Sequence, residues 1–173
     1  TDDEKNGLGM PNRYLQNLEY MRYTSENQFT REMWQRNYSG IARANTAILN
    51  IPDINMDETI RARLVGEAKF LRALYYFNLV RFYGDVPMIL KLETVEDALG
   101  ARTPAAQVYE QIIQDLLDAE ASLPISYSDK DIGRATQGAA LRLNSQQWSV
   151  VEGFEREFLA FLHKQGFYLG DRC

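Results

Sequence analysis

The residue types that most often carry catalysis are scarce in this chain. His163 is the only histidine and Cys173 the only cysteine among 173 residues. A Ser-His-Asp triad or a histidine-based metal site would depend on His163 alone, and no second cysteine is present for an internal disulfide. Paired carboxylates could hydrolyse a glycosidic bond, but the sequence gives no reason to place any two of Glu67, Asp85, Glu93 and Glu96 across a cleft. We predict a protein that binds or assembles and is not an enzyme.

One stretch has the polar spacing that opens a calcium-binding loop. Asp53, Asn55 and Asp57 alternate with apolar residues, as the first ligands of such a loop do. The match then fails, because Glu58 stands where the loop needs glycine and Leu64 stands where it needs a bidentate glutamate. We therefore predict that Asn55 is a helix N-cap, with Glu58 completing a capping box. We predict no metal ion, no cofactor and no catalytic residue.

Aromatic side chains provide the chemistry that best suits binding. Tyr14, Tyr20, Tyr23 and Trp34 gather ahead of the most apolar part of the chain. Rings of this kind stack on the apolar face of a sugar, and they also pack well in protein cores. Both interpretations stay open, because Trp34 is in helical register with Tyr38 and so fits a core position, whereas the three tyrosines lie outside that pattern. We predict Tyr14, Tyr20, Tyr23 and Trp34 as ligand-binding candidates.

Helical periodicity indicates the elements that must position these rings. Apolar residues recur at three- and four-residue steps over residues 28–49 and 55–83. Thr103 and Pro104 open a further helix as N-cap and first helical residue, and residues 133–136 open another. The inner face of the helix after Pro104 is predicted to carry Val108, Ile112, Leu116, Ala119 and Leu123, and to be widened by Tyr109, Ile113 and Leu117. No stretch alternates with the period of a strand. The sequence predicts a nearly all-α fold of antiparallel helix pairs.

The helix predicted over residues 55–83 is apolar around much of its circumference, so we expect contacts from two directions. Gly84 ends it in a left-handed conformation, and Pro87 prevents continuation. We expect the polar groups on or beside this helix, Glu67, Arg72, Arg81 and Asp85, to be buried and to fix the register of the helices. We expect Asn45 and Asn78 to bond to neighbouring backbone. One side carries Leu64, Ala68, Leu71, Tyr75, Asn78, Leu79 and Phe82, and the other carries Phe70, Leu74 and Phe77.

Composition excludes two classes of interaction. The net charge of −5 and the pI near 5.0 argue against nucleic acid, whose phosphates need a basic surface. No run of about 18 apolar residues is present, so the sequence predicts no membrane-spanning helix. The chain starts at Thr1 without an initiator methionine or a signal peptide. We expect that a leader has been removed or that the chain begins within a longer protein.

The sequence resembles the SusD/RagB family in five blocks, which follow the family's order between about residues 30 and 140. Their order and number make the resemblance more specific than any single block. The blocks are residues 34–45 (WxxxYxGIxRAN), 67–80 (EAxFLRAxxYFxLV), 83–87 (YGDVP), 108–116 (VYxxIxxDL) and 133–140 (GRATxGAA).

This resemblance implies a function and a location. Members of the family are surface-exposed outer-membrane lipoproteins built on tetratricopeptide-like helical repeats, and they bind glycans or other nutrients beside a TonB-dependent transport barrel. The resemblance therefore implies an incomplete α-solenoid that binds an oligosaccharide or other nutrient at the outer cell surface. It also implies delivery to a SusC-type transporter, and attachment to the membrane only through a lipid anchor missing from this chain.

The resemblance does not extend to the end of the chain. We predict a partial SusD-like helical domain over residues 1–140 and an atypical helical tail over residues 141–173, whose sequence suggests a truncated or frame-shifted end. An alternative function is a helical-repeat module that binds a protein partner and no small-molecule ligand, through apolar grooves between hairpins.

Overall fold

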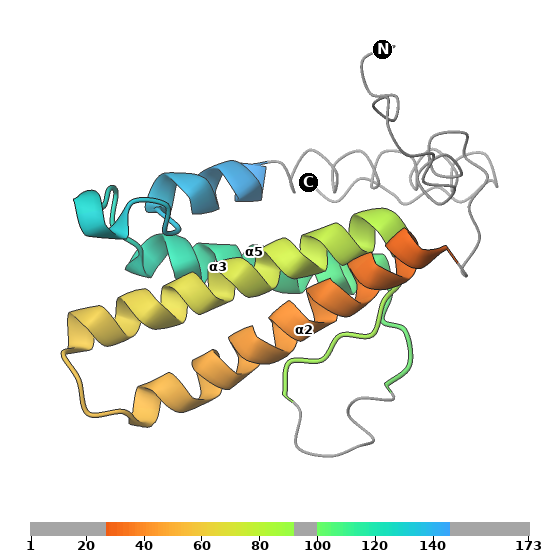
Figure 1. The fold of residues 1–173 in the computed structure, drawn as a ribbon, viewed down its shortest axis with the longest axis horizontal. Coiled ribbons are helices and arrows are strands. Elements are labelled where there is room, and N and C mark those ends of the chain that lie inside the picture. The colour runs from red at the N-terminus through yellow and green to blue at the C-terminus, as the bar shows by residue number, and fades with distance from the viewer. Residues whose placement is uncertain (1–26, 92–99, 146–173) are drawn as a thin grey trace, which may run out of the picture.

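The computed structural model describes residues 27–91 and 100–145 (Figure 1). Its long helices are α2 (Gln28–Asn50), α3 (Glu58–Tyr83) and α5 (Ala105–Ser122). A further helical segment covers residues 137–145. Short 3-10 turns, η2 (Ile51–Asp53) and η3 (Asp129–Asp131), lie in the connections. In this part of the chain no strand forms, and the predicted all-α class is confirmed.

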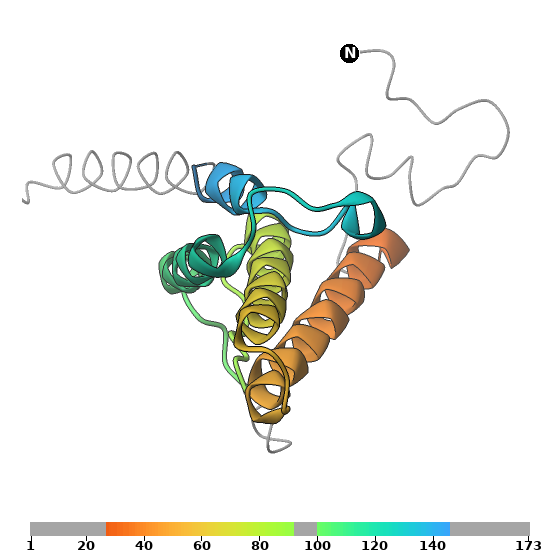
Figure 2. The ribbon, with the colours of Figure 1, turned by 90° about the vertical axis from the view of Figure 1, so that its left-hand side faces the viewer.

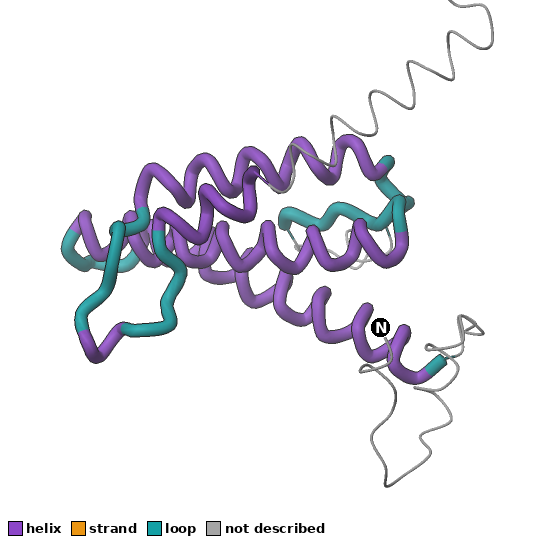
Figure 3. Tube along the Cα trace, turned by 90° about the horizontal axis from the view of Figure 1, so that it is seen from above, coloured by secondary structure: helices purple, strands orange, loops and turns teal. Residues whose placement is uncertain are grey.

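The helix α3 is the centre of the fold. It packs against α2 on one side and against α5 on another (Figure 2). Seen from above, the helices lie side by side, with the loop after α5 at one end of the bundle (Figure 3). The two-sided contact expected for α3 is therefore confirmed, and it explains why this helix is apolar around so much of its circumference.

One continuous core joins the helices. The five residues predicted at the centre of the inner face of α5 are buried, but Leu117, predicted to widen that face, is 46% exposed. On α3 the prediction is only partly right, because Leu71 is 41% exposed and Phe82 is 67% exposed. Leu71 lines a groove between α2 and α3. Arg81 and Asp85, which were expected to be buried, are exposed. The buried residues of α3 are Gly66, Ala68, Arg72, Ala73, Tyr76, Phe77, Leu79 and Val80.

A buried ion pair fixes α3 to its two neighbours. The guanidinium of Arg72 donates from Nε and Nη2 to the two carboxylate oxygens of Asp115 on α5, both at 2.7 Å. Its Nη1 donates to Oδ1 of Asn45 on α2 at 2.9 Å. The side chains of Arg72 and Asp115 are only 8% and 2% exposed. A bidentate pair of this geometry sets how the helices lie along one another, as expected for Arg72.

Two predicted helix starts differ from the structure. Asp57, not Asn55, caps α3 by accepting the amide of Ile60 at 3.1 Å. At α5 the N-cap position is Pro104, and the side chain of Thr103 makes no capping bond. Instead Asp85, twenty residues earlier in the chain, accepts the amide of Ala105 at 2.9 Å. An amide at a helix N-terminus has no partner inside the helix, so a carboxylate from any neighbouring segment can satisfy it.

The residues after α3 connect it tightly to α5. Gly84 has the positive φ that a left-handed end requires, 67°, but its ψ of −122° lies outside the left-handed helical region. Its amide donates to the carbonyl of Val80. Val86 is fully buried and forms an isolated antiparallel bridge with Thr103. The YGDVP block therefore ends α3 and caps α5 through Asp85. Through the bridge from Val86 to Thr103 it also holds the start and the end of the α3–α5 connection together.

The loop after α5 is also fastened to α3. Glu67 accepts hydrogen bonds from the hydroxyl of Tyr127 at 2.8 Å and from Nη1 of Arg134 at 2.7 Å. Arg134 also donates to Asp131 at 2.7 Å. The helix over residues 137–145 then begins after Thr136, whose hydroxyl accepts the amide of Ala139, as the sequence predicts.

Candidate functional site

Trp34 lies near the start of α2 in a cluster of aromatic rings. Its ring is 4.8 Å from that of Tyr38, tilted by 46°, and 5.0 Å from that of Tyr83, edge to face at 86°. Trp34 is half-buried and packs against the core without being enclosed by it. Trp34 therefore fits both interpretations, core residue and ligand-binding candidate, because it packs against the core and also lines a pocket.

The pocket beside Trp34 has a volume of about 320 Å³. This lies at the lower end of the range, about 300–1,000 Å³, that is common for small-molecule sites. Its walls come from one face of α2 and from the segment that follows α3, residues 86–91. They include Trp34, Tyr38, Ile41, Asn45, Pro87 and Ile89.

Side chains of α2 and α3 fix the backbone of the outer wall. The hydroxyl of Tyr38 donates to the carbonyl of Pro87 at 2.7 Å. The carbonyl of Ile89 accepts from Nδ2 of the Asn45 side chain at 2.8 Å and from the hydroxyl of Tyr76 at 2.9 Å. The Ile89 amide donates to the same hydroxyl at 2.7 Å. The wall is therefore held in place before any ligand arrives.

This arrangement extends to the buried ion pair. Because Arg72 occupies Oδ1 of Asn45, the amide nitrogen of Asn45 is turned toward the carbonyl of Ile89. Asn45 bonds to backbone as predicted. Asn78 does not, because its amide donates to the side chain of Asn37 at 3.2 Å. Two polar residues on apolar helix faces thus have different roles, which periodicity alone does not separate.

Burial changes the acidity of the two tyrosines in the wall. It raises the pKa of Tyr76 to about 12, an effect that the hydrogen bond with Ile89 and the charge of Arg72 partly offset. Burial also raises the pKa of Tyr38, and the nearby Tyr76 adds to the rise. Both phenols are therefore protonated at neutral pH and keep their hydroxyl donors to the backbone carbonyls.

The other predicted site residues are not placed by the structure. Tyr14, Tyr20 and Tyr23 lie outside the described residues, as do His163 and Cys173. Whether the three tyrosines join Trp34 stays a prediction. What the sequence analysis missed is the wall over residues 86–91, and the available signal was Pro87 in the YGDVP block, directly after a helix end.

Two of the carboxylates named as catalytic candidates have structural roles. Glu67 holds the loop after α5, and Asp85 caps that helix. Over residues 27–91 and 100–145, no group of three or more His, Cys, Asp or Glu side chains is placed to hold a metal ion. No helix within these ranges is long and apolar enough to cross a membrane.

A family model described as "Starch-binding associating with outer membrane" matches residues 2–146. The chain belongs to the SusD-like family. This match covers the five blocks from which the SusD/RagB resemblance was inferred, and it confirms that resemblance.

Individual SusD-like proteins are similar in sequence and structure. SusD-like protein P38 of Formosa agariphila is 39% identical over 98 residues, which are 56% of this chain and 19% of that protein. A SusD-like protein from Bacteroides fragilis superposes with a TM-score of 0.72 at 31% identity, covering 90% of this chain and 31% of the other. A structure described as a laminarin-binding SusD-like protein gives 0.67 at 36% identity, covering 76% and 29%. The chain thus spans under a third of each of these relatives.

Proposed function

We propose that this SusD-like chain forms part of a glycan-binding surface used for nutrient uptake. The observation that carries the proposal is the half-buried ring of Trp34 on a preformed pocket of about 320 Å³ within a SusD-like helical frame. A relative of known structure is described as binding laminarin, a polysaccharide, which supports a glycan as the ligand class. Tyr14, Tyr20 and Tyr23 are proposed to add further rings.

The proposed mechanism is reversible capture without covalent chemistry. The polar groups of the outer wall already bond to each other, so the pocket offers mainly apolar faces. A pyranose has an apolar face that stacks on such a ring, while its hydroxyl groups stay in water or reach groups at the rim. Because the wall is fixed in advance, binding costs little ordering of the protein.

We place the captured glycan in a transport pathway by family resemblance. The proposed partner is a TonB-dependent SusC-type barrel, the proposed location is the outer cell surface, and attachment would be through a lipid anchor. No enzymatic step is part of the proposal.

Affinity electrophoresis through gels that contain laminarin, starch or other polysaccharides tests the proposal. The 173-residue chain and the product of the whole gene that encodes it should be run in parallel. Retardation by at least one glycan is expected, and Trp34→Ala should abolish it. Phe82→Ala is the matched control, because Phe82 is an exposed ring of α3 that does not line the pocket. Equal retardation of both variants would exclude Trp34 as the stacking residue.

A protein-binding module is the second candidate. Ile125 and Ile132 are 82% and 73% exposed on the loop that Glu67 holds against α3, and exposed apolar side chains on a fixed loop suit a protein interface. The position of the gene separates the two candidates. A barrel-transporter gene beside it supports nutrient capture, and its absence together with no retardation by any glycan favours the protein-binding module.

A further inference from the structure

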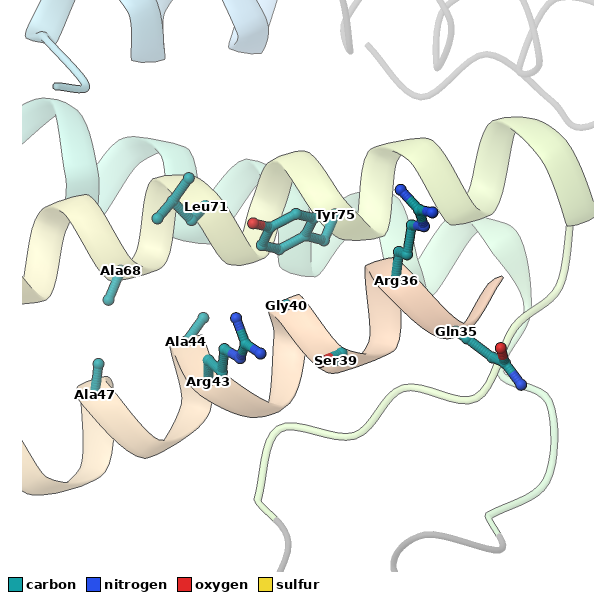
Figure 4. A pocket seen from close by; sticks show the side chains of 10 residues that line it. All are labelled: Gln35, Arg36, Ser39, Gly40, Arg43, Ala44, Ala47, Ala68, Leu71 and Tyr75. Atoms are coloured by element: carbon teal, nitrogen blue, oxygen red, sulfur yellow. The ribbon is translucent and has the colours of Figure 1, made fainter. Parts of the chain in front are cut away.

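A second groove lies between α2 and α3, on a different face of α2 from Trp34 (Figure 4). It has a volume of about 620 Å³, in the middle of the range for small-molecule sites. Small residues of α2, Gly40, Ala44 and Ala47, form one side, and Ala68, Leu71 and Tyr75 of α3 form the other. Nothing in the proposed Trp34 site uses these residues.

The groove contains an aromatic face. Figure 4 shows the ring of Tyr75 turned broadside between the two helices. The ring lies against Gly40 so closely that a Cβ atom there would be 2.4 Å from its nearest carbon. Beside it, Leu71 is 41% exposed. The half-buried ring of Tyr75 and the exposed side chain of Leu71 form a surface on which the apolar face of a sugar can stack.

The rim of the groove is positively charged in an otherwise acidic protein. No Asp or Glu occurs from residue 33 to residue 52, or from residue 68 to residue 84, although the whole chain has a net charge of −5. Arg36 and Arg43 stand on the α2 side of the groove (Figure 4). Arg36 pairs with Glu32 at 3.1 Å, but its side chain is 80% exposed, and such pairs are weak. Arg43 has no ion pair with any described residue.

Several polar groups at the groove have no partner within the described residues. These are the side chains of Gln35, Ser39 and Arg43 and the hydroxyl of Tyr75. A docked helix could reach these groups only through its side chains, because its backbone groups bond to each other. A ligand rich in hydroxyl and anionic groups satisfies them directly, and this favours a charged sugar over an acidic helix.

We infer that the groove between α2 and α3 binds acidic glycans, meaning sugars that carry carboxylate or sulfate groups. The inference rests on the glycan-binding function proposed above and adds a second site with its own ligand class. Tyr75 supplies the stacking face, and Arg43, assisted by Arg36, pairs with the anionic group. Ser39 and Gln35 bond to hydroxyl groups of the sugar.

Calorimetric titration and affinity electrophoresis test this with two acidic probes, polygalacturonate and dextran sulfate, and two neutral ones, laminarin and starch. Arg43→Gln is expected to weaken binding of an acidic probe about tenfold, the effect of losing one charged hydrogen bond, and to leave neutral probes unchanged. Tyr75→Leu should also weaken acidic binding while keeping the charge. Arg142→Gln is the control for charge, since Arg142 is exposed and lies outside the groove. Its effect should stay within about twofold for each probe, since single exposed charges contribute little.

The possible results separate this inference from the proposed function. If no glycan of either kind binds, both are wrong. If laminarin or starch binds and neither acidic probe does, the function stands and the acidic site is wrong. If Arg43→Gln and Arg142→Gln lose affinity for the acidic probes equally, the binding is a general attraction between charges and the site is wrong. Binding of a glutamate-rich helical peptide through Arg43, with no acidic glycan bound, would overturn it in favour of a docked helix.

Discussion

Replacing Asp115 with asparagine tests how much of the fold depends on the buried ion pair. The substitution keeps the shape of the side chain but removes its charge. Arg72 would then keep Asn45 and one carbonyl oxygen as acceptors, while one of its two 2.7 Å bonds to α5 would face an amide donor. Breaking a buried pair from one side costs about 3–5 kcal/mol, because the remaining charge stays desolvated.

This cost is large compared with the whole stability of a domain, which is about 5–15 kcal/mol. Urea unfolding of Asp115→Asn, followed by far-ultraviolet circular dichroism, measures it. Asp118→Asn is the matched control on the same helix, since Asp118 pairs with Lys69 at 2.5 Å, where the two side chains are 23% and 38% exposed. An exposed pair of this kind contributes under about 1 kcal/mol.

Two further outcomes complete the test. The double variant Arg72→Met with Asp115→Leu should recover part of the loss, because it leaves no unpaired charge in the core. If Asp115→Asn costs no more than Asp118→Asn, the pair does not determine stability in the way that its burial implies, and the reasoning is refuted.

Three other predictions can be measured in the same unfolding assay. Gly84→Ala should cost about 1–2 kcal/mol, because a φ of 67° is strained for alanine; an unchanged midpoint would contradict this. Gly40→Ala should cost about 1–3 kcal/mol, because the new methyl group meets the ring of Tyr75, and a smaller loss in the double variant with Tyr75→Leu would confirm the cause. Burial tends to raise the pKa of Asp118, but the hydrogen bond and charge of Lys69 hold it below its usual value. The contribution of this carboxylate to the free energy of unfolding is therefore complete above about pH 4 and is lost as the pH falls further. Asp118→Asn should make the free energy of unfolding depend less on pH in that acid range. If the variant and the original chain lose stability in parallel there, Asp118 does not carry this pH dependence.

Most of the helical framework could be predicted from the sequence because it depends on local patterns. The inner face of α5 repeats at three- and four-residue steps, and its five central members are buried, although Leu117 at its edge is 46% exposed. The end of α3 followed from Gly84, since few other residues tolerate that conformation. The role of Arg72 followed from a charged residue on a helix with apolar sides, although its partner Asp115 did not.

The failures come from contacts between distant segments. Asp85 caps α5 from twenty residues away, so no local signature marks it, and the Thr103–Pro104 pattern pointed to the wrong cap. Leu71 and Phe82 fit an apolar stripe, but periodicity does not say which stripe a neighbour covers. For the same reason the sequence could identify Trp34 as a candidate and could not foresee that the residues after Pro87 would form the opposite wall.

The contacts of Arg72 also affect the order in which the chain assembles. Asn45 precedes it by 27 residues and Asp115 follows it by 43, so α2 and α3 can pair before α5 is present. A two-helix intermediate of that kind holds a guanidinium group in a half-built interior with only an amide to receive it. Such a species is disfavoured until α5 arrives, and α2, α3 and α5 are expected to gain and lose structure together as one cooperative unit.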